Sequence, residues 1–228
     1  MTGDISRETL TIHREDFWAT TSNKQLNFVQ HIFSSLKMHG RAAVVLPDNV
    51  LFEGGAGETV RRELLKQVDL HTILRLPTGR FYARGVKANV LFFDRKPPQP
   101  DGQANTQRVW FCDLRTNQHF TLKARPLQHA DLDEFVRLYR ADNRLTREGT
   151  FSEANPQGRW RSYDASELLA RDKASLDLFW LKDDSLSDSD NLPAPEVIAS
   201  EIIEDLQAAL DQLKELEGDL QPGSNSAA

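Results

Sequence analysis

The stretch that decides the fold runs from Gly40 to Arg95 and reads GRAAVVLPDNVLFEGGAGETVRRELLKQVDLHTILRLPTGRFYARGVKANVLFFDR. Three short runs of apolar residues, many of them β-branched or aromatic, predict buried strands over 42–46, 70–76 and 90–93. Apolar residues at three- and four-residue spacing predict a helix over 58–67, between the first two runs. Strand, glycine-rich loop, helix and strand in this order are typical of an α/β fold.

The same patterns predict elements on both sides of this stretch. A helix is predicted to begin at Ser22, where Gln25 three residues later completes a capping box. We expect it to end at Gly40, since glycine tolerates a left-handed backbone. A further short strand is predicted over 108–112.

Between residues 113 and 182 the sequence predicts two short helices and little else. Asp131 and Asp164 each have a glutamate three residues later, which is a capping-box pattern, and apolar residues follow at helical spacing. The polar segment 141–161 is predicted to be irregular. The apolar sequence LDLFWL at 176–181 fits either a strand or a packing segment.

The loop PTGRFYARGVKA, residues 77–88, places aromatic side chains among cations. It is too short for a crossover helix, so the strand after it is predicted to return antiparallel. Aromatic rings stack on bases and cations hold phosphates, which makes the loop a candidate nucleic-acid contact. In the alternative, which composition alone favours, the rings pack on the sheet and the cations stay in water. The base-stacking candidates are Phe81 and Tyr82, and the DNA-binding candidates are Arg75, Arg80, Arg84 and Lys87.

The glycines of the sequence GGAGET, residues 54–59, suggest a phosphate-binding loop, but the match is partial. A P-loop needs Lys and then Ser or Thr after its last glycine, and here Glu58 follows Gly57. A dinucleotide-binding fingerprint needs a third glycine where Val60 stands. An NTPase or a dehydrogenase is therefore disfavoured.

Composition is that of a folded protein, with 39% hydrophobic and 27% charged residues among 228. No apolar run reaches the ~20 residues of a membrane-spanning helix, and the first residues lack the core of a signal peptide. The only cysteine, Cys112, excludes an internal disulfide, and its neighbours Trp110 and Phe111 predict a buried thiol. These features predict a cytoplasmic protein without a metal site.

Charge is unevenly distributed along the chain. Residues 183–220 carry twelve acidic side chains and one lysine, a net charge of −11. The rest of the chain has 22 acidic and 27 basic residues, a net charge of +5. The basic part is compatible with nucleic acid, whereas the acidic part favours a protein partner. Two ordinary solvated surfaces would explain the same charges.

Near the C-terminus, apolar residues three or four apart predict a long amphipathic helix that needs a partner surface. The predicted parts of the chain are an irregular segment (1–20), an α/β part (21–126), a mixed and mainly helical extension (127–182), a linker (183–195), the long helix (196–220) and a disordered tail (221–228). The predicted partner interface consists of Ile198, Ile202, Leu206, Leu213 and Leu216.

Five segments resemble the methylase (modification) subunit of bacterial type I restriction-modification systems. The resemblance covers nearly the whole chain from about Arg14. The matching sequences are REDFWATTSNKQLNFVQHI at 14–32, GRAAVVLPDNVLFEGGAGET at 40–59, DLHTILRLPTGRFYARGVKANVLFFDR at 69–95, SEANPQGRWR at 152–161 and ARDKASLDLFWLKD at 170–183.

The resemblance implies a Rossmann-like sheet and transfer of a methyl group from S-adenosylmethionine to the exocyclic amino group of adenine in DNA. The runs at 42–46, 70–76 and 90–93 would be the last three strands of that sheet, with the final one antiparallel and inserted beside its predecessors. The implied partners are DNA, a DNA-specificity subunit and a motor-nuclease restriction subunit. In such enzymes the loop between the last two strands commonly lends an aromatic side chain to the flipped base.

Two motifs of that family are missing from this sequence. One is the glycine-rich cofactor loop after the first strand of the sheet, and the glycines at 54–57 belong to a later loop. The other is the catalytic motif, Asn or Asp followed by Pro-Pro and Phe or Tyr. The only Pro-Pro, Pro97-Pro98, has the wrong neighbours. We therefore expect the C-terminal portion of a methylase subunit, with no catalytic residue present and most of the S-adenosylmethionine pocket elsewhere.

Two functions remain open on this basis. One is part of an adenine methyltransferase that is active only with its other half. The other is a non-catalytic module that docks on the specificity subunit through its C-terminal helix, and both can hold together.

Overall fold

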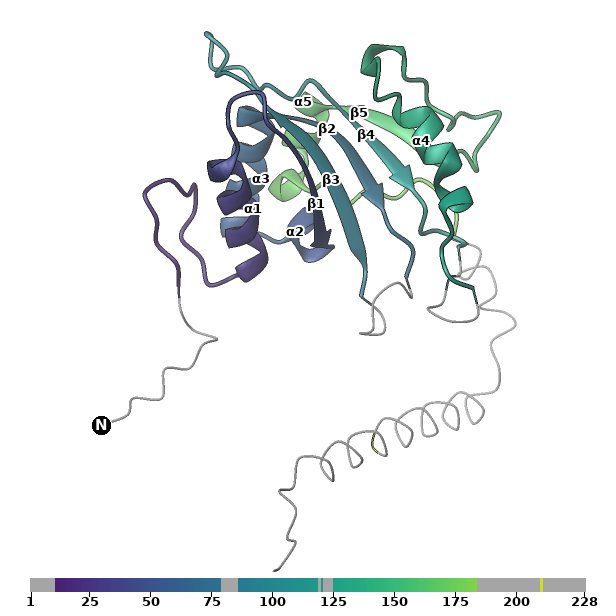
Figure 1. Cartoon of the computed structure of the whole chain (residues 1–228), viewed down its shortest axis with the longest axis horizontal. Helices are drawn as coiled ribbons and strands as arrows, with labels where there is room; N and C mark the ends of the chain where they lie inside the picture. The colour runs from purple at the N-terminus through teal and green to yellow at the C-terminus, as the bar shows by residue number, and fades with distance from the viewer. Residues whose placement is uncertain (1–10, 79–85, 119, 121–124, 184–209, 211–228) are drawn as a thin grey trace, which may run out of the picture. The chain divides into compact units, whose positions relative to one another are not determined.

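A five-stranded mixed sheet forms the centre of the structure, a computed structural model, and its strands lie in the order β1-β3-β2-β4-β5 (Figure 1). β3 lies between β1 and β2 and pairs antiparallel with both. β4 pairs in parallel with β2, and β5 pairs antiparallel with β4. The α/β prediction and the inserted antiparallel strand are confirmed. The strands span Arg41–Pro47 (β1), Val68–Arg75 (β2), Ala88–Arg95 (β3), Arg108–Asp113 (β4) and Trp160–Asp164 (β5).

The structure describes residues 11–78, 86–118, 120, 125–183 and 210. The chain divides into two compact units, Met1–Lys182 and Asp183–Ala228. Except for residues 183 and 210, the predicted linker, long terminal helix and tail lie outside the described residues, as does the stripe predicted to meet a partner.

Helices pack on both faces of the sheet. Apolar side chains of α1, α3 and α5 join one core with side chains of β1, β2, β3 and β4. α4 covers part of the opposite face, where Phe135 packs with Leu74, Cys112 and Trp160. The helices span Lys24–Ser35 (α1), Asn49–Phe52 (α2), Ala56–Gln67 (α3), Asp133–Tyr139 (α4) and Ala165–Ala170 (α5), and short 3-10 turns span His129–Leu132, Arg144–Thr146 and Asp172–Ala174.

The first helix differs from its prediction at both ends. Asn23, not Ser22, is its N-cap, because the Asn23 side chain accepts hydrogen bonds from the backbone N–H groups of Gln25 and Leu26. The helix ends at Ser35, and the left-handed residue after it is His39, with φ 63°. Gly40 is needed for space instead, since a Cβ there would lie 2.8 Å from a backbone oxygen.

The two later capping boxes do not form as predicted. The box that forms joins Gln128 and Asp131 and starts the 3-10 turn ahead of α4. Asp164 does stand at the N-cap of α5, but its side chain makes no cap hydrogen bond and accepts one from Arg108 Nε at 2.9 Å instead.

β5 was missed by the sequence analysis, which expected an irregular segment up to residue 161. It extends the sheet across residue 126, the predicted boundary of the α/β part. The segment 176–181 is not a strand but packs on the core, with Leu176 and Leu178 buried. Cys112 is buried as expected, and burial raises the pKa of its thiol.

Two features are absent from the described residues. None of the helices there is long and apolar enough to cross a membrane. The same part of the chain contains no group of three or more His, Cys, Asp or Glu side chains arranged to hold a metal ion.

Candidate nucleic-acid interface

The two strands joined by the loop with the aromatic and basic residues meet at one end of the sheet. β1, β2 and β4 point toward this end, β3 starts from it, and the loop joins β2 to β3 there (Figure 1). In open α/β sheets, ligands bind outside the carboxyl ends of the strands. The two described ends of the loop therefore lie where ligands usually bind in this kind of fold.

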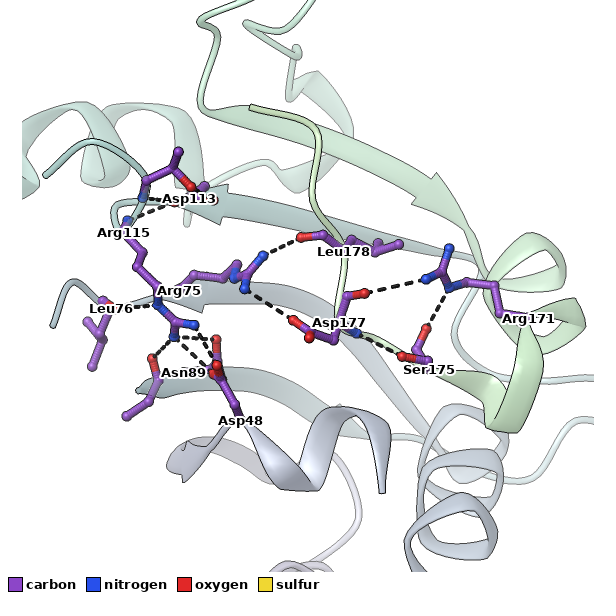
Figure 2. A network of polar contacts seen from close by, with 12 residues as sticks. Asp48, Arg75, Leu76, Asn89, Asp113, Arg115, Arg171, Ser175, Asp177 and Leu178 are labelled. Atoms are coloured by element: carbon purple, nitrogen blue, oxygen red, sulfur yellow. Dashed lines mark hydrogen bonds and ion pairs between the residues drawn. The ribbon is translucent and has the colours of Figure 1, made fainter. Parts of the chain in front are cut away.

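One guanidinium, that of Arg115, connects four strand ends below the loop (Figure 2). Its Nε donates to the carbonyl of Leu76 at 3.0 Å, just after β2, and its Nη2 donates to the carbonyl of Ala88 at 2.9 Å, the first residue of β3. Its Nη1 and Nη2 also donate to the two carboxylate oxygens of Asp48 at 2.6 and 3.0 Å, just after β1. Arg115 itself follows β4. We call Arg115, Asp48 and Asn89 the loop clamp.

The Asp48 carboxylate is the acidic partner within the loop clamp. Asn89 is fully buried and donates from Nδ2 to Asp48 Oδ1 at 2.7 Å. Burial alone would raise the pKa of Asp48, but the hydrogen bonds and charge of Arg115 and the bond from Asn89 outweigh it and hold that pKa below its usual value. The carboxylate is therefore charged, and the bidentate ion pair with Arg115 is of the strong, geometrically specific kind.

A turn after β4 orients the Arg115 side chain toward its acceptors on Asp48, Leu76 and Ala88. The Asp113 side chain accepts hydrogen bonds from the backbone N–H groups of Arg115 and Thr116, each at 2.7 Å, and from Thr116 Oγ1 at 2.9 Å. Arg159 holds the Asp113 carbonyl at 2.8 Å. The orientation of Arg115 is thus fixed by its own backbone as well as by its acceptors.

Arg75, the last residue of β2, is only 2% exposed. Its guanidinium donates to the carbonyl of Leu178 and, at 3.1 Å, to the carboxylate of Asp177 (Figure 2). It also lies over the Phe179 ring, 4.3 Å from the ring centroid. Burial lowers the pKa of Arg75. Its contact with DNA stays a prediction, because in the described chain the guanidinium is engaged by the segment after α5.

Of the other residues predicted to contact DNA, the structure describes Lys87. Lys87 is exposed at the end of the loop, as a phosphate contact requires. Phe81, Tyr82, Arg80 and Arg84 lie outside the described residues, and their roles stay predictions.

The glycine-rich segment before α3 surrounds a protein side chain. Arg61 is 1% exposed and donates to the carbonyls of Val50 at 2.9 Å and Glu53 at 2.7 Å. A Cβ at Gly57 would lie 3.1 Å from Arg61 Nη1. Packing against a buried arginine therefore accounts for Gly57 without a bound phosphate, in agreement with the sequence analysis.

A hollow of about 1320 Å³ lies at the opposite end of the sheet. Its charged lining is largely self-paired: Arg144 contacts Asp94 at 2.6 Å and Asp69 at 3.4 Å, and Arg108 contacts Asp164 at 2.9 Å. These ion pairs leave little free charge for a ligand, so size alone does not make this hollow the functional site.

The loop clamp was missed by the sequence analysis. Its members are separated by up to 67 residues, and no local pattern links them. One signal was present, since Asp48 and Arg115 each lie just past a predicted strand and polar residues there meet at one end of a parallel sheet.

Comparison with known proteins gives consistent matches. Residues 6–158 match the family described as N-6 DNA Methylase. The methylase subunit of type I restriction enzyme EcoKI from Escherichia coli (strain K12) is 44% identical over 219 residues, which are 86% of this chain and 41% of that protein.

Solved structures agree with the sequence comparison. The crystal structure of the EcoKI M protein matches with a TM-score of 0.66 at 39% identity, over 96% of this chain and 48% of that one. A structure from work on complex assembly and conformational transition of the type I R-M system matches with a TM-score of 0.59 at 28% identity, over 93% of this chain and 44% of that one. The chain thus spans between two fifths and one half of the length of these relatives.

Proposed function

Because the chain belongs to the N-6 DNA methylase family, we propose that it is part of the methylase subunit of a type I restriction-modification system. The subunit would methylate the exocyclic amino group of adenine in DNA, using S-adenosylmethionine. The observation that carries the proposal is the match of almost the whole chain to the EcoKI M protein at 39% identity. The same role places the chain in the bacterial cytoplasm with its DNA.

In this function the chain provides one wall of the base-binding site. An enzyme that modifies a base in duplex DNA must flip it out of the helix and hold it by stacking and by contacts to its edge. We assign the stacking to Phe81 or Tyr82, and the neighbouring phosphates to Arg80, Arg84 and the exposed Lys87. The fixed ends of this loop, at the carboxyl ends of three strands, support the assignment.

The sequence lacks the cofactor loop of the family, and the glycine-rich segment around Gly57 packs on the buried Arg61. We therefore assign the cofactor pocket and the catalytic acceptors to the rest of the subunit. The chain alone should lack a micromolar site for S-adenosylmethionine in a calorimetric titration.

Reconstitution tests the function directly. The chain is mixed with the N-terminal part of a related methylase subunit and a specificity subunit, and transfer of radiolabelled methyl to DNA is measured. We expect transfer only in the complete mixture. Phe81→Ala and Tyr82→Ala should reduce it, because base stacking contributes ~1–3 kcal/mol per base. No transfer in any pairing would refute the methylase assignment.

A second candidate function is docking without catalysis. The strongly acidic sequence of 183–220 and its apolar residues at helical spacing support a separate interaction role. We propose that Ile198, Ile202, Leu206, Leu213 and Leu216 contact the specificity subunit, and that the restriction subunit joins the same assembly. Replacing Leu206 and Leu213 with Asp should abolish co-purification with the specificity subunit, and unchanged co-purification would move the interface elsewhere.

A further inference from the structure

We propose that Arg115 is a positioning residue for methyl transfer, because it sets the separation and direction of the two ends of the base-contacting loop through the loop clamp. The inference rests on the proposed function, but the geometry behind it lies entirely within described residues. Arg115 does not touch DNA in this proposal. It acts through Leu76 and Ala88, which begin and end the loop.

The two loop ends are also joined by backbone hydrogen bonds and by pairing in the sheet, where Pro47 lies opposite Ala88 and Arg75 lies opposite Asn89. The Leu76 N–H donates to the Ala88 carbonyl at 3.0 Å, and the Asp48 N–H donates to the Lys87 carbonyl at 3.1 Å. The first bond joins Leu76 and Ala88, whose carbonyls both accept from Arg115. The second bond lies directly beside it, at Lys87. Without the guanidinium, the Leu76 carbonyl would lose this donor, the Ala88 carbonyl would be left with the Leu76 N–H, and the Asp48 carboxylate would be left with Asn89.

The geometry requires arginine at this position. Five N–H donors in a planar fork reach acceptors on β1, β2 and β3 at once, whereas the ammonium of lysine is a compact charge without the planar fork needed for the bidentate contact. The side chains of Arg115 and Asp48 are 10% and 17% exposed, so the pair is shielded from the screening that weakens ion pairs in open water. A misplacement of about 1 Å far from the chemistry can cost on the order of 100-fold in rate.

Amide hydrogen exchange on the 228-residue chain tests the clamp itself. Arg115→Lys and the near-isosteric Asp48→Asn should increase exchange at the Leu76 and Asp48 amides by about tenfold or more, which is local opening. Exchange in β4 and β5 should change little. Arg108→Lys is the matched control, because Arg108 forms an exposed ion pair with Asp164 at the other end of β4. Unchanged exchange at the loop ends, or an equal increase throughout the sheet, would refute a positioning role.

Kinetics in the reconstituted methylase test the consequence for transfer. For Arg115→Lys we expect kcat to fall on the order of 100-fold, with KM for S-adenosylmethionine unchanged. The fluorescence of 2-aminopurine at the target position, which reports base flipping, should fall as well. Arg108→Lys should match the wild type.

If Arg115→Lys is also within about twofold of the wild type, the inference is wrong although the proposed function stands. If the wild type itself transfers no methyl group, the proposed function fails, and hydrogen exchange still decides whether the clamp holds the loop.

Discussion

Buried arginine side chains connect segments of this chain that are distant in sequence. Arg61, Arg75 and Arg147 are each at most 6% exposed and donate to backbone carbonyls of distant segments. Burial lowers the pKa of each guanidinium, to about 10 for Arg61 and Arg147, but they remain charged at neutral pH. Removing one would leave several buried carbonyls without a donor, at a cost of ~1–3 kcal/mol each.

His71 gives the fold a specific pH response. It is 6% exposed, and its Nδ1 lies 2.8 Å from Thr72 Oγ1. Burial and the charge of Arg144 lower its pKa to about 3. In the unfolded chain His71 takes up a proton near pH 6.5, whereas in the folded chain it stays neutral down to about pH 3. Stability therefore falls as the pH falls from 6.5 toward 3.

We therefore expect His71→Gln to flatten the loss of stability between pH 6.5 and 5. The loss from this residue is at most about 1.4 kcal/mol per pH unit. Denaturant unfolding at a series of pH values measures it. His129→Gln is the control, because the His129 side chain is 90% exposed. Equal pH slopes for the wild type and His71→Gln would contradict the prediction.

Among the elements, α1 shows how a cap is chosen between neighbouring residues. Asn23→Ala should destabilise the protein by about 1 kcal/mol, because two N–H groups at the start of the helix lose their acceptor. Ser22→Ala should change little. The Asn23 side chain also donates a hydrogen bond to Glu53 at 2.8 Å. Asn23→Ser tests the cap alone, because serine can cap the helix but cannot make this second bond. Thermal unfolding provides the comparison, and a larger effect of Ser22→Ala would contradict it.

The sequence predicted the elements that local pattern controls. β1, β2 and β3 are apolar runs, and α3 has a regular stripe, so their positions were predicted within a few residues. β5 reads WRSYD, with polar residues at three of its five positions, and it forms because β4 offers an edge to pair with. Register and pairing of this kind depend on contacts between distant residues, which no local window contains.

In the candidate site, too, local sequence pattern could be used for prediction, whereas contacts between distant residues could not. The loop 77–88 was a candidate nucleic-acid contact by its aromatic and basic residues and by the family resemblance, whereas the loop clamp joins residues brought together only by the sheet. Arg75 illustrates the limit further, since its neighbours in sequence suggested an exposed cation and its contacts come from residues 177–179.

For the whole molecule, the division into two units predicts independence of the first. A chain that ends at Asp183 should unfold within about 2 °C of the full-length chain, because unit Met1–Lys182 contains the sheet and both cores. Calorimetry of the two chains measures this. A clearly lower unfolding temperature would show that the acidic segment supports the fold.

The position of β1 at the edge of the described sheet has a consequence for handling the protein. A strand at an edge presents unpaired backbone groups to any other strand, which is a common route to aggregation. β1 is seven residues long and carries only one charged side chain, Arg41, while Val45 is 55% exposed on it. Copies of the chain would meet edge to edge at high concentration. A lysine in place of Val45 would oppose that pairing without disturbing either core.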